Sequence, residues 1–403
     1  MEDRELITKT SEYIDSHRDE MLALWEQIVS IESGTGDKEG VDRVGAVLDT
    51  ALKSAGVETS LIRMEHYGNL LTGVFGKENP GQPIVLIGHM DTVFAKGTLA
   101  KNPFRIDENG QAHGPGILDM KAGLVIAVYV LKALHEYGYD KRPIRVVFAG
   151  DEENGHRQTN AEDEIRRLCA GCAAAFNFET GFLDDGLVVG RKGSCRVTLT
   201  VHGVAAHAGN DPQRGRNAIL EMAYKVIEIQ KLHDFEHGLF VNVGVIQGGT
   251  VANAVPASCE VNIDIRYDRL ERLEETLQAI RKIAETNTVP DTTAEMTWTK
   301  PSTVMPVSEE NLKLFRHVQE AADLIGYGPL TTKKVGGWSD SCLAAAEGVP
   351  VVCAMGVKGA NNHSMEEYAV AVSYTHLGMP NKPPRYRPFY LMMYNEESWF
   401  GIG

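Results

Sequence analysis

The sequence has 403 residues, of which 43% are hydrophobic and 24% are charged, and its formal net charge is −15. A chain of this length exceeds a single ordinary core, so we expect two domains. The acidic balance argues against nucleic-acid binding, which needs a basic face, and no apolar run approaches the length of a membrane span. Residues 1–5 lack the basic start of a signal peptide, which favours a cytoplasmic location.

Strand-like and helix-like segments alternate in the first part of the chain. The helix-like segments are 5–30, 38–56, 122–137 and 160–169, and the strand-like segments are 61–64, 69–75, 83–88, 144–149 and 173–178. The segment 122–137 is nearly apolar throughout, so it should be deeply buried. This order predicts a mixed, mostly parallel sheet flanked by helices, which is an α/β fold.

The order of predicted strands and helices changes near residue 192. A strand, a helix, two strands, a helix and a strand then follow at 195–202, 217–232, 240–247, 259–267, 270–285 and 294–299. This is the order of a ferredoxin-like α+β module. After residue 301 the first pattern resumes, with helices at 309–324 and 341–347 and a strand at 351–355. We therefore expect a catalytic domain over 1–191 and 302–372, interrupted by an inserted domain over 192–301.

Residues 373–403 do not fit either pattern. This stretch contains four prolines and many aromatic residues, and it keeps neither a helical nor a strand period. We expect a poorly ordered tail, with a frameshift or sequencing junction near Ser373.

Five histidine and acidic residues each lie where a predicted strand ends in a polar loop. They are His89, Asp119, Glu153, Glu179 and His363. Loops at strand ends are where a rigid scaffold usually holds its chemistry. A histidine and carboxylate set without cysteine suits zinc, or a similar divalent ion, at a catalytic site. This interpretation depends on the occurrence of all five residues at such positions, because Glu179 and His363 are ordinary residues when taken singly.

Each motif also has a structural interpretation. His89 and Asp91 are two apart at the end of a strand, so Asp91 can accept the second ring N–H of His89. The alternative is a polar pair in a strand-end turn. Asp119 precedes an apolar helix and could be its N-cap, although glycines at 114 and 116 indicate a constrained backbone. Glu152 and Glu153 follow Asp151, and three adjacent carboxylates need either a cation or solvent.

Taken together, these motifs resemble the two-metal amidohydrolase and exopeptidase family. This family comprises glutamate carboxypeptidases, acetylornithine deacetylases, succinyl-diaminopimelate desuccinylases and aminoacylases. The similarity covers roughly residues 10–370, and segments 88–94, 96–100 and 114–121 are closest to the glutamate carboxypeptidase branch. A divided catalytic domain with an inserted dimerisation and lid domain is the architecture of that family.

The resemblance implies a role for each of these residues. Asp119 would bridge two zinc ions, with His89 and Glu179 completing one site and Glu153 and His363 the other. Cobalt or manganese would accept the same ligands. Glu152 would be the general base and Asp91 the residue that orients the histidine. The family usually has a cis peptide after the bridging aspartate, here between Asp119 and Met120.

The resemblance also implies substrate contacts in the inserted domain and in a glycine-rich loop. His207 would reach the active site of the other subunit of a homodimer and stabilise the oxyanion. Asn253 and Arg266 would hold the substrate, with Arg266 binding its terminal carboxylate, and Gly337 would belong to a substrate loop. The structural alternatives are a turn histidine, a turn asparagine and a strand arginine paired with Asp264 or Asp268.

The implied reaction is hydrolysis of an amide or peptide bond next to a free amino-acid carboxylate, of the glutamate carboxypeptidase type. The substrate would be a small peptide or an N-acyl amino acid. Deacylation of N-acyl amino acids and dipeptide cleavage share this site and remain alternatives. The alternative outside the enzymes is a dimeric homologue that keeps the fold and binds a ligand without catalysing a reaction.

Overall fold

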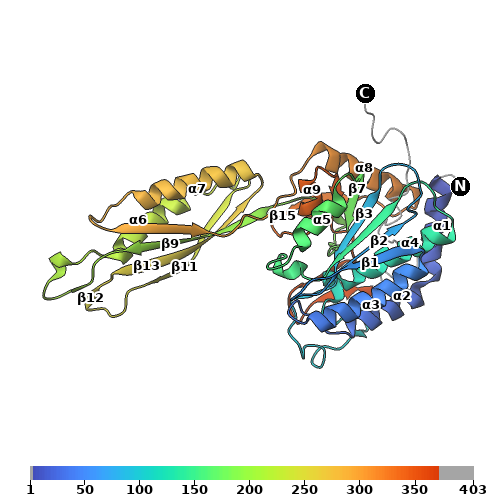
Figure 1. Cartoon of the computed structure of the whole chain (residues 1–403), viewed down its shortest axis with the longest axis horizontal. Helices are drawn as coiled ribbons and strands as arrows, with labels where there is room; N and C mark the ends of the chain where they lie inside the picture. Colours follow the sequence, from blue (N-terminus) through green and yellow to red (C-terminus); the bar gives the residue numbers. More distant parts are fainter. Residues whose placement is uncertain (1–2, 372–403) are drawn as a thin grey trace. The chain divides into compact units, whose positions relative to one another are not determined.

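The computed structural model describes residues 3–371 (Figure 1), so the expectations for the tail 373–403 and for a junction near Ser373 lie outside the described residues. Contacts divide the chain into two compact units. Unit 1 contains the described residues up to Val189, then Val307–Lys334 and those from Ser339 onward. Unit 2 contains Gly190–Pro306 and Val335–Trp338. The inserted unit is thus longer than the predicted 192–301 at both ends, and it also takes in Gly337.

A six-stranded sheet with the order β1-β2-β6-β3-β7-β16 organises unit 1. β3 runs parallel to β6 and β7, β16 runs parallel to β7, and β1 and β2 pair antiparallel. All six residues of β3 are buried, as expected for a sheet that is covered on both faces. The predicted α/β class is confirmed. The strands are β1 Val57–Ile62, β2 Leu70–Phe75, β3 Ile84–His89, β6 Ile144–Ala149, β7 Ala174–Asn177 and β16 Val351–Val352.

The helices of unit 1 flank this sheet (Figure 1). Twelve residues of α4 are buried, as its apolar sequence predicts, and α1, α2 and α3 contact it. α5 and α9 contact each other and strands of the sheet. The helices are α1 Asp3–Ser16, α2 Arg18–Val29, α3 Lys38–Ser54, α4 Ala122–Glu136, α5 Ala161–Cys169, α8 Glu309–Leu324 and α9 Ser341–Ala346.

Two local predictions were wrong. The single helix expected over 5–30 is broken at His17, where the Ser16 hydroxyl and the His17 ring both hydrogen-bond to the Tyr13 carbonyl. Such side-chain bonds to the backbone compete with continuation of a helix. The first strand begins at Val57 rather than 61, because Gly56 adopts a φ of 74° that turns the chain out of α3.

Several short strands carry no pattern that the sequence could reveal. β4, β5, β17 and β18 form a four-stranded sheet with the order β17-β18-β5-β4, and β8 pairs with β15. The turn between β17 and β18 contains His363, so this small sheet positions one of the predicted ligands. The strands are β4 Arg105–Ile106, β5 Gln111–His113, β8 Gly186–Arg191, β15 Thr331–Val335, β17 Gly359–Ala360 and β18 Tyr368–Val370.

Unit 2 has the predicted ferredoxin-like order. Its antiparallel sheet runs β11-β13-β9-β14, and α6 and α7 pack on it. Burial alternates along β9 because the helices cover only one face of the sheet. A separate two-stranded ribbon joins β10 and β12. The elements are β9 Gly193–His202, β10 Ala206–His207, α6 Ala218–Gln230, β11 Phe240–Gly248, β12 Ala254–Val255, β13 Ser258–Tyr267, α7 Leu270–Glu285 and β14 Thr293–Trp298.

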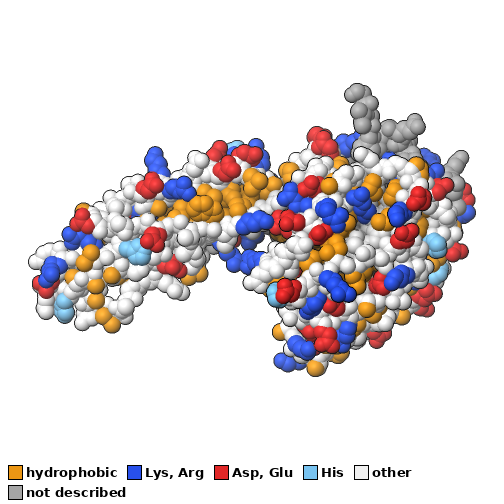
Figure 2. All heavy atoms as spheres, viewed as in Figure 1, with side chains coloured by type: hydrophobic (Ala, Val, Ile, Leu, Met, Phe, Trp, Pro, Cys, Tyr) orange, Lys and Arg blue, Asp and Glu red, His pale blue; other side chains and the backbone are white. Residues whose placement is uncertain are grey.

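Charges of both signs are interspersed over the visible face of each unit (Figure 2). Such mixing gives no extended single-sign field on that face. Within residues 3–371, no helix combines the length and apolar character needed to cross a bilayer.

Candidate metal centre

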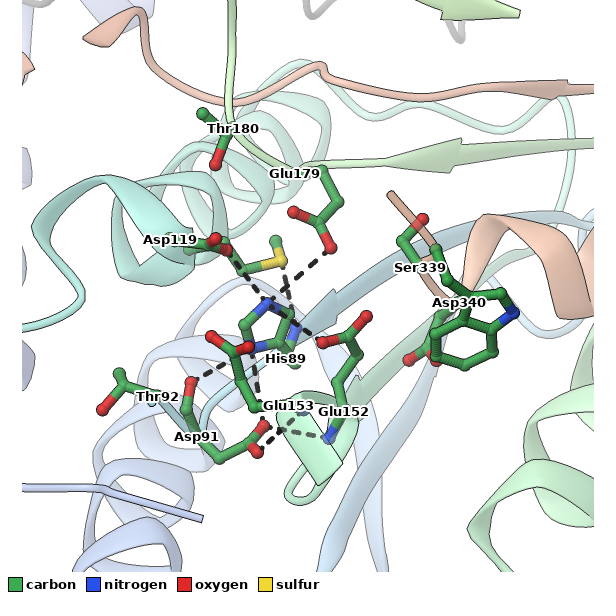
Figure 3. A network of polar contacts seen from close by, with 12 residues as sticks. His89, Asp91, Thr92, Asp119, Glu152, Glu153, Glu179, Thr180, Ser339 and Asp340 are labelled. Carbon is green, nitrogen blue, oxygen red and sulfur yellow. Dashed lines mark hydrogen bonds and ion pairs between the residues drawn. The ribbon is translucent and has the colours of Figure 1, made fainter. Parts of the chain in front are cut away.

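His89 is the last residue of β3, and its ring lies among carboxylates (Figure 3). Its Nδ1 is 3.0 Å from the Asp91 carbonyl oxygen and 3.4 Å from Asp91 Oδ1. Its Nε2 is 3.3 Å from Asp119 Oδ1 and 3.7 Å from Glu179 Oε1. Asp91 therefore faces one ring nitrogen, and the other nitrogen faces the predicted ligands.

Asp119 lies in the segment Ile117–Lys121 directly before α4, where the backbone angles of Asp119 and Met120 are non-helical, and its peptide bond to Met120 is cis. Oδ1 faces His89, whereas Oδ2 is 3.2 Å from Nε2 of His363. The N-cap of α4 is Lys121, so the alternative interpretation of Asp119 as a helix cap is wrong. Its carboxylate instead lies between two imidazole rings.

The five predicted ligands form two groups that share Asp119. Ligand atoms of His89, Asp119 and Glu179 all lie within 4.8 Å of one another, and so do those of Asp119, Glu153 and His363. Nε2 of His363 is 3.4 Å from Oε2 of Glu153. The side chains come from the ends of β3 and β6, from the segment after β7, and from the turns before α4 and β18, so the fold assembles a cluster from distant segments.

Asp91 also holds the turn that carries Glu152 and Glu153. Its Oδ1 accepts the backbone N–H of Glu152 at 3.1 Å, and its Oδ2 accepts that of Glu153 at 3.2 Å and the Thr35 hydroxyl at 2.7 Å. Glu152–Asn154 forms one turn of 3-10 helix there. The sequence predicted only the contact of Asp91 with His89. The structure shows that one buried carboxylate fixes both the histidine and the acidic turn.

Ionisation of both Glu152 and Glu153 is unfavourable in the acidic turn, because the two carboxyl groups are buried among other negative charges. Burial raises the pKa of Glu152 well above its usual value; His89 opposes this rise, and the negative charges of Glu179 and Asp340 add to it. Burial also raises the pKa of Glu153 to about 8. Protons or a divalent cation must therefore offset the charge of this cluster.

The donor set fits a divalent transition metal. It consists of imidazole nitrogens and carboxylate oxygens without a thiolate, which is chemistry that zinc, cobalt and manganese all accept. In addition, Oε1 of Glu153 is buried and has no hydrogen-bond partner among residues 3–371. A cation bound at that position would satisfy this buried carboxylate oxygen.

Sequence reasoning missed Glu367, which organises the turn around Asp119. Glu367 is fully buried, and its Oε1 accepts the backbone N–H of Leu118 at 2.8 Å and that of Asp119 at 3.3 Å. Asn362 was also missed as a contact, although its Nδ2 donates to Asp119 Oδ2 at 3.2 Å. An acidic residue four positions after a candidate ligand is a weak signal, and only the folded chain shows its target.

The predicted substrate residues belong to unit 2. His207 lies in β10, and its Nδ1 accepts the backbone N–H groups of Gly209 and Asn210, each at 3.1 Å. The Asn253 carbonyl accepts the N–H of Ala208 at 3.0 Å, so the two predicted segments are neighbours. Within this unit, His207 lies in the ribbon and Asn253 directly precedes β12, and both residues are exposed.

Arg266 and Gly337 have contacts of their own within unit 2. Nε of Arg266 is 2.9 Å from Oδ2 of Asp264, which is one of the ion pairs that the structural alternative predicted. The Gly337 carbonyl accepts Nη1 of Arg191 at 3.0 Å. A substrate role for either residue stays a prediction.

The His363 side chain is 53% exposed, whereas those of the other four candidate ligands are at most 9% exposed. Such a cluster of histidines and carboxylates at the strand ends of an α/β sheet is typical of metal-dependent hydrolases. Residues 85–376 match the family described as Peptidase family M20/M25/M40, and the chain belongs to this family of hydrolases.

The chain is 32% identical over 356 residues to carboxypeptidase G2 of Pseudomonas sp. (strain RS-16), an alignment that covers 86% of this chain and 84% of that protein. It is 29% identical over 251 residues to an acetylornithine deacetylase of Pasteurella multocida (strain Pm70), covering 57% and 62% of the two chains. The solved structure of the aminopeptidase PepT from Bacillus cereus ATCC 10987 superposes with a TM-score of 0.77 at 18% identity, covering 93% of this chain and 97% of that one. This structural similarity shows the fold.

Proposed function

We propose that the protein is a two-zinc metallohydrolase that cleaves an amide or peptide bond next to a free amino-acid carboxylate, with glutamate carboxypeptidase activity as the specific form. The observation that carries this proposal is the position of Asp119, one carboxylate shared by two groups of candidate ligands. The 32% identity to a carboxypeptidase supports the choice of substrate class.

His89 and Glu179 would hold one ion, and Glu153 and His363 the other, with Asp119 common to both. Two zinc ions bound there would polarise the scissile carbonyl and lower the pKa of the attacking water. Cobalt or manganese would serve with the same donors.

Glu152 would act as the general base and then as the general acid. Its Oε2 is 3.9 Å from Nε2 of His89, and Asp91 anchors its backbone, so the carboxylate is held beside the ligand cluster. In that position it would take a proton from the attacking water and deliver it to the leaving amine.

His207 is suited to stabilise the oxyanion. Because its Nδ1 accepts two backbone N–H groups, the ring proton resides on Nε2, which can donate a hydrogen bond to the developing negative charge. Arg266 would exchange its Asp264 partner for the terminal carboxylate of the substrate, which a guanidinium binds with two parallel hydrogen bonds. Asn253 and Gly337 would complete the substrate contacts.

Unit 1 offers space for the acyl part of the substrate. A cavity of about 690 Å³ opens beside Glu153. Tyr67 and Phe94 are among its lining residues, and both are partly exposed. We assign this cavity to the group on the acyl side of the scissile bond.

Homodimerisation through unit 2 is part of the proposal. β11 is an edge strand, and the adjoining α6 and β11 expose large apolar side chains that a partner would cover. These side chains are 40–57% exposed and comprise Ile219, Leu220, Tyr224, Ile227, Val245 and Ile246. In such a dimer, His207 would serve the active site of the partner.

We also propose a cytoplasmic location. All six cysteines are free and buried, which suits a reducing compartment.

The decisive experiment is hydrolysis of a panel of C-terminal glutamate peptides, N-acyl amino acids and dipeptides by the zinc-loaded protein. We expect cleavage of the glutamate peptides that stops when a chelator is added and returns with zinc. Preferential cleavage of N-acetyl or N-succinyl amino acids would support the deacylase alternative, which the similarity to an acetylornithine deacetylase favours. No hydrolysis of any panel member would contradict the proposed function and favour a binding homologue.

A further inference from the structure

His156 is enclosed between two carboxylates next to the candidate base. Its Nδ1 is 2.8 Å from Oδ1 of Asp151, and its Nε2 is 2.6 Å from Oδ1 of Asp340. The three residues are at most 4% exposed. Neither the sequence motifs nor the mechanism above uses this histidine.

With both carboxylates ionised, the three groups satisfy one another when His156 is an imidazolium. Each ring nitrogen faces a carboxylate oxygen, so each must donate a proton. Burial opposes the charged ring, but Asp340 and Asp151 raise the pKa of His156 well above its usual value. One cation between two anions leaves each buried carboxylate with a charged partner, and removing the ring would leave both without it.

His156 thus forms a bridge between Asp151 and Asp340, and the contacts of Asp151 place one end of this bridge at the start of the acidic turn. Asp151 directly precedes the helical turn Glu152–Asn154, and its carbonyl accepts the backbone N–H of His156 at 3.2 Å. Its Oδ2 accepts the Thr159 hydroxyl at 2.6 Å. The side chain of Asp151 is thus held from two directions by residues that follow the turn.

The contacts of Asp340 place the other end of the bridge beside the ligand cluster. Asp340 precedes α9 and lies near Glu152 in Figure 3. The neighbouring Ser339 accepts Nδ2 of Asn177 at 3.4 Å, and Asn177 is the last residue of β7, two positions before Glu179. His156 therefore connects two segments. One is the turn that carries Glu152, and the other is the segment of Ser339 and Asp340, which contacts the end of β7 shortly before Glu179.

We propose that His156 is a positioning residue that bridges Asp151 and Asp340 and so fixes the turn that presents the Glu152 carboxylate to the attacking water. This inference rests on the proposed hydrolytic function. Asp91 holds the backbone of the same turn, and His156 holds Asp151, the residue that directly precedes it.

The first test measures catalysis by the zinc-loaded variant His156→Gln. We expect kcat to fall by roughly 10- to 100-fold, because small displacements of a catalytic group have effects of that size. KM should change by less than about threefold, since the substrate contacts stay in place. In a Glu152→Gln background the same substitution should cause no further loss, because the group being positioned is already gone. Wild-type kcat in His156→Gln, or an equal fold-loss in both backgrounds, would overturn the inference.

The second test needs no substrate. Amide hydrogen exchange of the zinc-loaded full chain, read from peptides that cover 151–156, should be faster in His156→Gln than in the wild type. Unchanged exchange there overturns the inference whatever the kinetics show. A wild type that hydrolyses no panel member overturns only the proposed function, because the exchange measurement then still decides whether His156 fixes the turn.

The variant His317→Gln is a matched control. Nδ1 of His317 is 3.1 Å from Glu320 Oε2 on α8, so the substitution removes a histidine–carboxylate contact elsewhere in unit 1. It should leave kcat and exchange of 151–156 unchanged. If His156→Gln does not fold, Asp340→Asn removes the other end of the bridge with little change in shape and is judged by the same kinetic and exchange criteria.

Discussion

The Glu367 carboxylate accepts the backbone N–H of Leu118 at 2.8 Å and thereby holds the turn that presents Asp119. Burial raises the pKa of Glu367 to about 7, with backbone hydrogen bonds from Leu118 opposing the rise. A buried acidic group is thus retained at a position where its carboxylate accepts backbone N–H groups of the turn that carries Asp119. Such supporting contacts orient metal ligands, and their loss lowers the affinity for the metal.

We predict that Glu367→Ala weakens zinc binding at both candidate sites, because Asp119 is common to them. The expected loss is roughly 10- to 100-fold in affinity. Glu367→Gln, which keeps an acceptor oxygen, should lose less. Competition titrations with a chromophoric zinc chelator measure this. Two zinc ions bound to Glu367→Ala with wild-type affinity would contradict the role assigned to this carboxylate.

We predict that Glu152→Ala retains two zinc ions but loses nearly all activity. The loss should be about 10²- to 10⁴-fold in kcat, the usual contribution of a positioned general base. Elemental analysis and steady-state kinetics on the same sample provide the measurement. A variant that keeps most of its rate would show that another group takes the proton.

We predict that Asp91→Asn lowers kcat while both zinc ions remain bound. An amide would place an NH₂ group against either the backbone N–H of Glu152 or that of Glu153, both of which now donate to Asp91. That conflict should shift the acidic turn and reduce kcat by roughly 10-fold or more. The check is kinetics with a zinc assay, and equal rates in variant and wild type would contradict it.

The sequence was most informative about the candidate site where a histidine or an acidic residue follows the end of a predicted strand. His89, Asp119, Glu153, Glu179 and His363 follow this rule, and their ligand atoms lie close together in the structure. The long elements were also predictable, because periodicity over ten or more residues reports a buried face. The nearly apolar helix at 122–137 corresponds to α4, Ala122–Glu136.

The missed features depend on partners that are distant in the sequence. Glu367 binds a backbone segment 249 positions away, and His156 binds Asp340 184 positions away. Neither residue belongs to a local pattern, and strands of two or three residues such as β17 and β18 are too short to show a period. Such contacts follow from the assembled fold and not from any segment alone.

We predict that inactive His207→Ala and Glu152→Ala proteins complement each other when they are mixed as exchanging subunits. If His207 serves the partner's site, each mixed dimer contains one site with both residues. Half of the dimers are mixed at equal concentrations, so about a quarter of the wild-type activity should return. Activity no higher than that of the separate variants would argue against shared sites.

The buried pair of Glu221 and Lys225 in unit 2 leads to a pH-dependent prediction. Their side chains are 2.9 Å apart and at most 2% exposed, and Glu221 Oε2 also accepts the backbone N–H of Val289 at 2.6 Å. Burial opposes ionisation of Glu221, but the Val289 N–H and Lys225 outweigh it and lower the pKa of Glu221 below its usual value.

A carboxyl group whose pKa is lower in the folded than in the unfolded chain stabilises the fold above its unfolded-state pKa of about 4.3. This contribution is lost as the pH falls through the lowered folded-state value. Glu221→Gln should therefore reduce the stability of unit 2 by ~2 kcal/mol at pH 7, the size of a hydrogen-bonded charge contribution. The difference from the wild type should stay constant from about pH 6 to 8 and shrink below about pH 4.

Amide hydrogen exchange of α6 and α7, compared between variant and wild type at each pH, measures this difference within unit 2. Glu228→Gln is the matched control, because it removes the ion pair of Glu228 with Lys231, the C-cap of the same helix, and these two side chains are 54% and 63% exposed. Exposed pairs contribute little, so this control should change exchange only slightly at any pH. A pH-independent effect of Glu221→Gln, or an equal effect of Glu228→Gln, would mean that ionisation of Glu221 does not stabilise unit 2.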